Sequence, residues 1–129
     1  MTSAELKYLN AINELYDGTA GIKLTSIATK MNVTKVSVYR AVERLEKHGY
    51  IMRDEKNKVV MTEYGYEQLG KYNVLINWLS NHLQKYCRVS VEIAYNDAIG
   101  VICAFSDETK QVMADLIERD NEKINGSCI

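Results

Sequence analysis

The sequence predicts a mainly α-helical fold with a small β-hairpin, in which a winged helix-turn-helix is followed by an α-helical dimerisation domain. Three observations predict this fold class. Two short amphipathic helices and a charged hairpin follow one another between residues 24 and 62, apolar residues then recur at helical spacing as far as residue 117, and the chain has no proline to interrupt long helices.

The first predicted helix begins at a capping box formed by Thr2 and Glu5 and ends near Gly18. Its apolar stripe consists of Tyr8, Leu9, Ile12, Leu15 and Tyr16, which recur at helical spacing. We expect this helix to support the following elements from behind.

Two short helices come next, separated by a turn at Asn32 and Val33. We expect Thr25 to cap the first helix and Thr34 to cap the second. The inner faces of the two helices consist of Leu24, Ile27, Ala28 and Met31 in the first and Val38, Ala41, Val42 and Leu45 in the second.

A hairpin is expected after the second helix, which ends at Gly49 because glycine readily adopts the left-handed conformation that follows a helix. Residues 50–52 and 59–61 are the two predicted strands, and the polar residues 54–58 are the turn between them. Two lysines occupy this turn, as expected for a hairpin that lies over a phosphate backbone.

The outer face of the second helix is basic and fits the major groove of DNA, which is about 12 Å wide. Arginine can bond guanine edges there, whereas lysine, serine and tyrosine can reach phosphates. The predicted DNA-binding residues are Thr34, Lys35, Ser37, Tyr39, Arg40, Arg44 and Lys47 on the helix and Lys56, Asn57 and Lys58 on the hairpin. The simpler alternative is that these charges are only the solvated face of an ordinary helix.

Three further helices are predicted: from Thr62 to about Tyr86, from about Val91 to Phe105, and one capped by Ser106. They carry more apolar surface than the winged unit can cover, so we expect a homodimer, which also suits the reading of paired DNA half-sites. The predicted domains are a DNA-binding domain at 1–62, a helical dimerisation domain at 63–119 and a flexible tail at 120–129.

Composition supports a DNA-binding front half and excludes several other classes. Residues 1–62 carry ten Lys and Arg against seven acids, and residues 63–129 carry six against ten. No stretch is apolar enough to cross a membrane and no secretion signal is present, so a cytoplasmic protein with the reduced thiols Cys87, Cys103 and Cys128 is expected. We find no glycine-rich phosphate loop and no nucleophile with a plausible base, so an enzyme is not expected.

The chain resembles the diphtheria toxin repressor family of iron- and manganese-dependent transcriptional regulators, most closely the short manganese transport regulator branch. The resemblance runs from about Leu6 to Leu116 and rests on four segments: LTSIATKMNV, SVYRAVERLEKHGYI, MTEYG and NDAIGVICAFSDE. It implies a repressor dimer that binds operator DNA when Mn(II) or Fe(II) occupies a site between the first helix and the dimerisation helices.

The positions that would supply the family's metal ligands hold other residues in this chain, and of those that match the family's Glu-x-x-Glu-His pattern only Cys103 could still bind a metal. The residues at these positions are Lys7, Asn10, Asn73, Ile99, Ile102 and Cys103. Hard ions such as Mn(II) prefer carboxylate, carbonyl or imidazole ligands, and the two isoleucines replace such groups with apolar packing. We therefore predict no Mn(II) or Fe(II) site and a DNA-binding form that does not require these ions.

Three alternatives stay open at the level of sequence. A soft metal such as Zn(II) or Cu(I) could bind His82, Cys87 and Cys103. A small organic ligand could instead gate the regulator from a cavity among Tyr72, Trp78, Tyr95 and Phe105. The winged helix could also serve only as a protein-interaction module.

Overall fold

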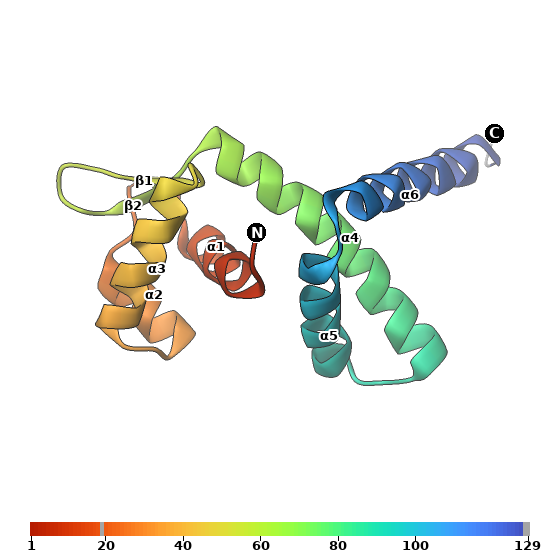
Figure 1. Cartoon of the computed structure of the whole chain (residues 1–129), viewed down its shortest axis with the longest axis horizontal. Helices are drawn as coiled ribbons and strands as arrows, with labels where there is room; N and C mark the ends of the chain where they lie inside the picture. The colour runs from red at the N-terminus through yellow and green to blue at the C-terminus, as the bar shows by residue number, and fades with distance from the viewer. Residues whose placement is uncertain (19, 128–129) are drawn as a thin grey trace. The chain divides into compact units, whose positions relative to one another are not determined.

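The computed structural model describes residues 1–18 and 20–127 and confirms the predicted fold class (Figure 1). Its elements are α1 (Ser3–Leu15), α2 (Leu24–Met31), α3 (Lys35–Lys47), β1 (Ile51–Arg53), β2 (Val59–Met61), α4 (Glu63–Cys87), α5 (Val91–Ala104) and α6 (Asp107–Ser127). The chain forms two compact units, Met1–Gly70 and the residues from Lys71 onward, and we describe each by itself.

The core of the first unit lies between α1, α2, α3 and the inner side of the hairpin. The apolar positions predicted for α3 are all buried, and they meet buried side chains from the other elements. The most completely buried are Leu6, Leu9, Ile12, Ile27, Val38, Val42, Leu45, Ile51 and Val59. Each contributes about 1.5 to 3 kcal/mol relative to an exposed side chain, so this core fixes how the outer face of α3 is presented.

Side-chain caps start the helices as predicted, except at α2. The hydroxyls of Thr2, Thr34 and Ser106 each accept a hydrogen bond from a backbone N–H three residues ahead. The prediction for Thr25 was wrong: α2 begins at Leu24, its N-cap is Lys23, and no side chain caps it. Because Thr25 is already inside the first helical turn, its side chain cannot take the capping position.

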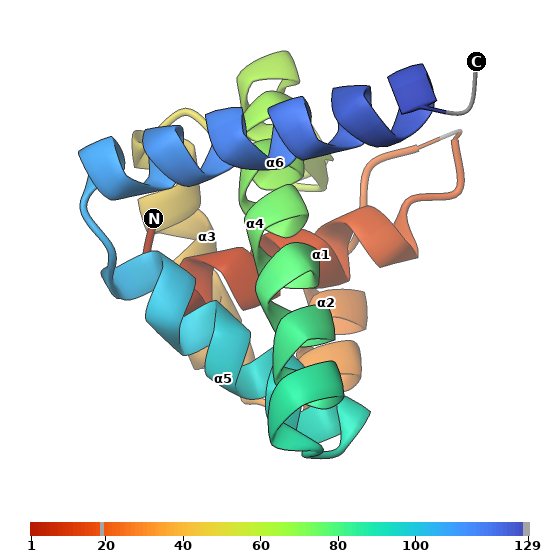
Figure 2. The same cartoon turned by 90° about the vertical axis from the view of Figure 1, so that its right-hand side faces the viewer.

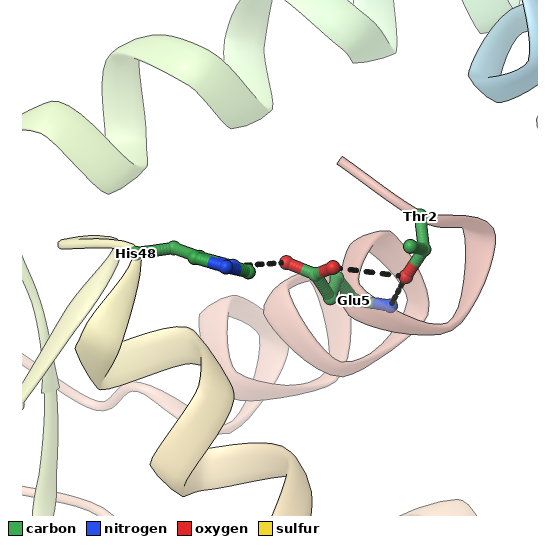
Figure 3. A network of polar contacts seen from close by, with 3 residues as sticks. All are labelled: Thr2, Glu5 and His48. Carbon is green, nitrogen blue, oxygen red and sulfur yellow. Dashed lines mark hydrogen bonds and ion pairs between the residues drawn. The ribbon is translucent and has the colours of Figure 1, made fainter.

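A polar contact joins α1 to the end of α3 (Figure 3). The Nδ1 atom of His48 lies 3.1 Å from Oε2 of Glu5, and the other oxygen of Glu5 accepts from the hydroxyl of Thr2 at 3.1 Å. Glu5 is only 7% exposed. Burial raises the pKa of Glu5, but the hydrogen bonds from His48 and Thr2 outweigh it and hold the pKa below its ordinary value.

The hairpin pairs Ile51 with Met61 and Arg53 with Val59 in antiparallel register. A third segment joins its outer edge, since Ile22 and Val59 exchange backbone hydrogen bonds of 2.8 Å in both directions. In the turn, Oδ1 of Asp54 accepts from the backbone N–H groups of residues 56 and 58, each at 2.9 Å. The turn is therefore held in one shape by its own backbone and one carboxylate.

The end of α3 and the start of α4 are tied together through Thr62. Gly49 has the left-handed φ of 81° that was expected after α3. The hydroxyl of Thr62 lies 2.6 and 3.1 Å from the carbonyl oxygens of Gly49 and Tyr50, which share its one hydrogen, and it accepts from the N–H of Gly65 at 2.9 Å. A Cβ on Gly65 would overlap the carbonyl of Tyr50, so α4 starts in direct contact with the hairpin.

The second unit contains most of α4 together with α5 and α6, and α5 returns alongside α4 after a short turn (Figure 1). The helix α6 crosses α4 (Figure 2), and Nζ of Lys110, in the first turn of α6, donates to the hydroxyl of Tyr72 on α4 at 2.6 Å. Burial lowers the pKa of Lys110, but hydrogen bonds to Tyr72 and Asp107 outweigh it and hold the pKa above its ordinary value.

Two boundaries in the second unit differ from the sequence-based ones. The helix α4 begins at Glu63, next to the predicted boundary, but the compact units divide at Gly70, about two turns further along. The helix α6 continues through residues 120–127, which were predicted to be a flexible tail. The segment RDNEK contains no proline or glycine, so nothing in it ends a helix. Cys128 lies outside the described residues.

No helix among the described residues combines the length and the hydropathy needed to cross a bilayer.

Candidate nucleic-acid interface

The outer face of α3 is exposed along its whole length. Lys35, Ser37, Arg40, Arg44 and Lys47 are all solvent-exposed, as predicted. The opposite side of the helix is buried and consists of Val38, Ala41, Val42 and Leu45. Thr34 and Ser37 also hold the start of the helix, because the backbone N–H and the Oγ of Ser37 lie 3.2 and 3.0 Å from the Thr34 hydroxyl. The fold therefore presents a polar and cationic helix face that is rigidly supported from behind.

Sequence analysis missed one apolar residue on this face. Val36, in the first turn of α3, is 62% exposed although valine is usually buried. An apolar side chain at this end of a DNA-reading helix can contact the methyl group of thymine. The sequence did contain a signal for this exposure, because Val36 lies between Lys35 and Ser37 and outside the apolar stripe of the helix.

A groove of about 390 Å³ lies where α2, α3 and the hairpin meet. Five predicted residues line it together: Lys35, Tyr39, Lys56, Asn57 and Lys58. Three further lining residues, Lys23, Leu24 and Thr25, come from the start of α2. Lys23 is thus a fourth groove lysine, which periodicity could not reveal because it precedes the helix. Arg40, Arg44 and Lys47 lie along α3 and are not lining residues of this groove.

The four groove lysines carry positive charge that the protein itself does not neutralise. Within the part of the chain that the structure describes, none of their ammonium groups forms an ion pair. Two nearby acids are engaged elsewhere: Glu46 binds Arg53, and Asp54 accepts backbone hydrogen bonds in the hairpin turn. Unpaired cations gathered in one groove attract an anion of matching spacing, such as the phosphates of a nucleic acid.

The positions where the family would place metal ligands do not fit a hard cation. Ile99 and Ile102 are 1% and 0% exposed and lie in the core of the second unit, where neither can coordinate an ion. Lys7 is exposed on α1, and Asn10, Asn73 and Cys103 are half-buried. Among the described residues, no group of three or more His, Cys, Asp or Glu side chains could hold a metal. A soft-metal site at His82, Cys87 and Cys103 is therefore not formed.

The aromatic residues considered for an organic ligand are occupied or exposed. Tyr72 is buried and bonded to Lys110, and the Trp78 ring lies 4.2 Å from the ring of His82. Tyr95 and Phe105 are each 37% exposed. These residues pack within the helices or lie at the surface of the chain.

Comparison with known proteins supports the same interpretation as the geometry. A family model described as the N-terminal DNA-binding domain of iron-dependent repressors matches residues 1–59. The HTH-type transcriptional regulator MntR of Lysinibacillus sphaericus (strain C3-41) is 29% identical over 96 residues, which are 74% of this chain and 68% of that protein.

Solved structures share the fold. The hypothetical protein SSo2273 from Sulfolobus solfataricus has a TM-score of 0.74 and 18% identity, with 92% of this chain and 91% of that chain covered. The manganese regulator SloR has a TM-score of 0.73 and 20% identity, with 95% of this chain covered. This chain spans only 55% of the length of SloR.

The matched DNA-binding domain, the MntR relative and the shared winged-helix fold agree with one another. These relatives are regulators and not enzymes. Residues 1–59 are similar to the N-terminal DNA-binding domain of iron-dependent repressors, the chain is similar to the transcriptional regulator MntR over 96 residues, and it shares its fold with the manganese regulator SloR.

Proposed function

We propose that this chain is a sequence-specific DNA-binding regulator that acts as a homodimer and requires neither Mn(II) nor Fe(II) to bind its operator. The observation that carries the DNA-binding part is the groove lined by four unpaired lysines. Two of its lining residues, Lys35 and Tyr39, belong to α3, so the groove borders the exposed face of that helix. One duplex can therefore contact both surfaces.

The two surfaces have different roles in this proposal. The helix α3 enters the major groove, where Arg40 and Arg44 bond base edges and set the sequence preference. The groove lysines neutralise backbone phosphates and set the affinity for any duplex.

Replacing Arg40 and Arg44 by Ala tests this division. Operator duplexes are first selected from random-sequence DNA, and binding is then measured by fluorescence anisotropy against a scrambled duplex. The double variant should lose discrimination between the two duplexes, by about 1 to 3 kcal/mol for each lost base contact. Arg119→Ala, on α6, is the matched control. Unchanged discrimination by the double variant would remove Arg40 and Arg44 from base recognition, whereas a wild type that selects no duplex would favour a protein-interaction module.

Independence from Mn(II) and Fe(II) follows from the two buried isoleucines. Where the family would bind an ion through carboxylate or imidazole, this chain packs Ile99 and Ile102 at 1% and 0% exposure. Hydrophobic contact then fixes this part of α5 without a cation.

Operator titrations in chelator and in added Mn(II) test this part of the proposal, together with calorimetric titration of Mn(II) into the protein alone. We expect equal operator affinities in chelator and in Mn(II), and no heat of stoichiometric Mn(II) binding in the calorimetric titration. A metal-induced gain of about tenfold, or 1.4 kcal/mol, would contradict it.

The homodimer is proposed from apolar surface on the second unit. Several large apolar side chains of its helices are exposed, which is unusual for a monomer. They are Val74, Tyr86, Val91, Ile93, Tyr95, Val101, Phe105, Val112 and Leu116. A second copy of the chain would cover them and would bring two α3 helices into one assembly, as the reading of paired half-sites requires.

A further inference from the structure

Arg53, the last residue of β1, makes contacts that were not expected from the sequence. Its Nε and Nη2 atoms lie 3.2 and 3.1 Å from the two carboxylate oxygens of Glu46 on α3. Its Nη1 lies 3.5 Å from Oδ1 of Asn57 in the hairpin turn, and its guanidinium carbon lies 5.5 Å from the centre of the Tyr39 ring. One side chain therefore joins the recognition helix to the tip of the hairpin.

The geometry makes Arg53 unlike the other cations of this surface. Its side chain is only 20% exposed, and both edges of its guanidinium group are occupied within the protein. The hydrogen bond from Arg53 holds the pKa of Glu46 below its ordinary value, and the hydrogen bonds to Glu46 and Tyr39 raise the pKa of Arg53. Both shifts favour the charged forms of Glu46 and Arg53.

Tyr39 lies between the two surfaces assigned above. It projects from α3, lines the lysine groove and remains 46% exposed. A tyrosine side chain can rotate about two bonds, so the cationic contact from Arg53 restricts where its ring lies. Asn57 is in the left-handed conformation at φ 62°, and its contact with Arg53 restricts the hairpin tip in the same way.

We propose that Arg53 is a positioning residue for operator recognition, which holds the Tyr39 ring and the hairpin tip in fixed register with α3. This inference rests on the proposed DNA-binding function. When the positions of Tyr39 and the hairpin tip relative to α3 are fixed, the base contacts of α3 and the phosphate contacts of the groove can form on one duplex at the same time. When they are not fixed, each surface still binds DNA, but the two surfaces no longer favour the same position of the duplex.

The contact requires arginine rather than any cation. A planar guanidinium can bind both oxygens of Glu46 and present its face to Tyr39 at the same time, whereas a lysine ammonium is a point charge. Arg53→Lys should therefore resemble Arg53→Ala. Both should lower the ratio of operator to scrambled-duplex affinity by about tenfold, which is 1.4 kcal/mol. Affinity for the scrambled duplex should stay within about twofold of the wild type.

The rival interpretation is that Arg53 simply contacts a phosphate. In that case Arg53→Lys would bind normally, and Arg53→Ala would weaken binding to every duplex and lower the slope of log affinity against log salt by about 1. That result would overturn the proposal.

Glu46→Gln gives a second, opposite test. It removes a negative charge beside the DNA, so a purely electrostatic surface would bind every duplex more tightly. The positioning role predicts lower discrimination instead, because Arg53 loses its charged partner. Equal or higher discrimination in Glu46→Gln would overturn the proposal. Glu43→Gln, on the exposed face of α3, is the matched control for the change in charge.

A measurement without DNA separates this inference from the function on which it rests. Amide order parameters of the free protein should fall at residues 54–58 in Arg53→Lys while the α1 and α2 amides stay unchanged. If the order parameters at residues 54–58 stay at their wild-type values in this folded variant, the positioning role of Arg53 is overturned. If the wild type binds no selected duplex, the proposed function fails and the recognition role of Arg53 fails with it.

Discussion

The carboxylate of Glu5 on α1 and the imidazole of His48 at the end of α3 are in contact although 43 residues separate them along the chain. Because an ionised carboxylate only accepts hydrogen bonds, the Nδ1 atom of His48 carries the proton of this contact. The pair fixes the end of the recognition helix to the helix behind it (Figure 3).

Replacing Glu5 by Gln should destabilise the protein at neutral pH by about 1 to 2 kcal/mol, because a buried charged hydrogen bond is lost. The folded-state pKa of Glu5 is lowered, so its contribution is present above the ordinary value of 4.5 and is lost as the pH falls through the lowered pKa. The difference in unfolding free energy between the two proteins should therefore shrink on acidification below pH 4.5.

Urea denaturation at several pH values from 7 downward measures this difference. Glu14→Gln is the control, because Glu14 pairs with Lys30 while 64% exposed, and surface pairs of this kind contribute less than about 1 kcal/mol. A difference between wild type and Glu5→Gln that grows below pH 4.5 would show that the carboxylate is not stabilised by His48.

Single replacement of Lys23 or Lys58 by Ala should weaken binding to operator and scrambled DNA by the same factor. Each removes one phosphate contact, so the slope of log affinity against log salt should become shallower by about 1. Anisotropy titrations between low and moderate salt measure the slope. Lys123→Ala, on α6, should leave it unchanged, and a Lys23 variant with the wild-type slope would remove Lys23 from the DNA-contacting surface.

Replacing Ile93 and Val101 by Asp should convert a dimer into monomers. Both side chains are exposed on α5, at 51% and 41%, so the change should not disturb the core of a single chain. Sedimentation equilibrium measures the mass, and circular dichroism checks that the helices remain. Tyr16→Asp, at an exposed site after α1, serves as the control. A wild-type protein that sediments as a monomer at every concentration would contradict the proposed dimer.

Shortening Ile102 to Ala should destabilise the second unit by about 2 to 5 kcal/mol, because it leaves a cavity in a fully buried site. Asn96→Ala, at an exposed polar position of the same helix, should change stability by less than about 0.5 kcal/mol. Thermal unfolding of both variants measures this contrast. Addition of Mn(II) should not restore the stability of Ile102→Ala, and a rescue by the ion would mean that a metal site exists nearby.

The sequence was most informative where structure depends on local pattern. The caps at Thr34 and Thr62 and the glycine at 49 could be predicted because each acts on residues only a few positions away. The hairpin followed from its polar turn between two apolar runs. The exposed face of α3 followed from helical periodicity, which separates inner from outer positions without knowledge of the partners.

Contacts between distant segments could not be predicted in this way. Arg53 fell between the predicted strand at 50–52 and the predicted turn at 54–58, and nothing in its neighbourhood along the chain shows that Glu46 and Tyr39 lie beside it. Lys23 precedes a helix and has no periodic signal, yet the fold brings it to the hairpin lysines. Thr25 misled because a threonine near a helix start fits two registers that differ by one or two residues.

The MTEYG segment has a mechanical consequence for the molecule. Thr62 bonds the residues that follow α3 to the first turn of α4. At Gly65 the two segments are too close for a side chain. A connection that is held by contacts on both sides is stiff. A rotation of the first turn of α4 would therefore also move the residues just before β1. A methyl group at position 65 would overlap the carbonyl of Tyr50 and disturb this connection.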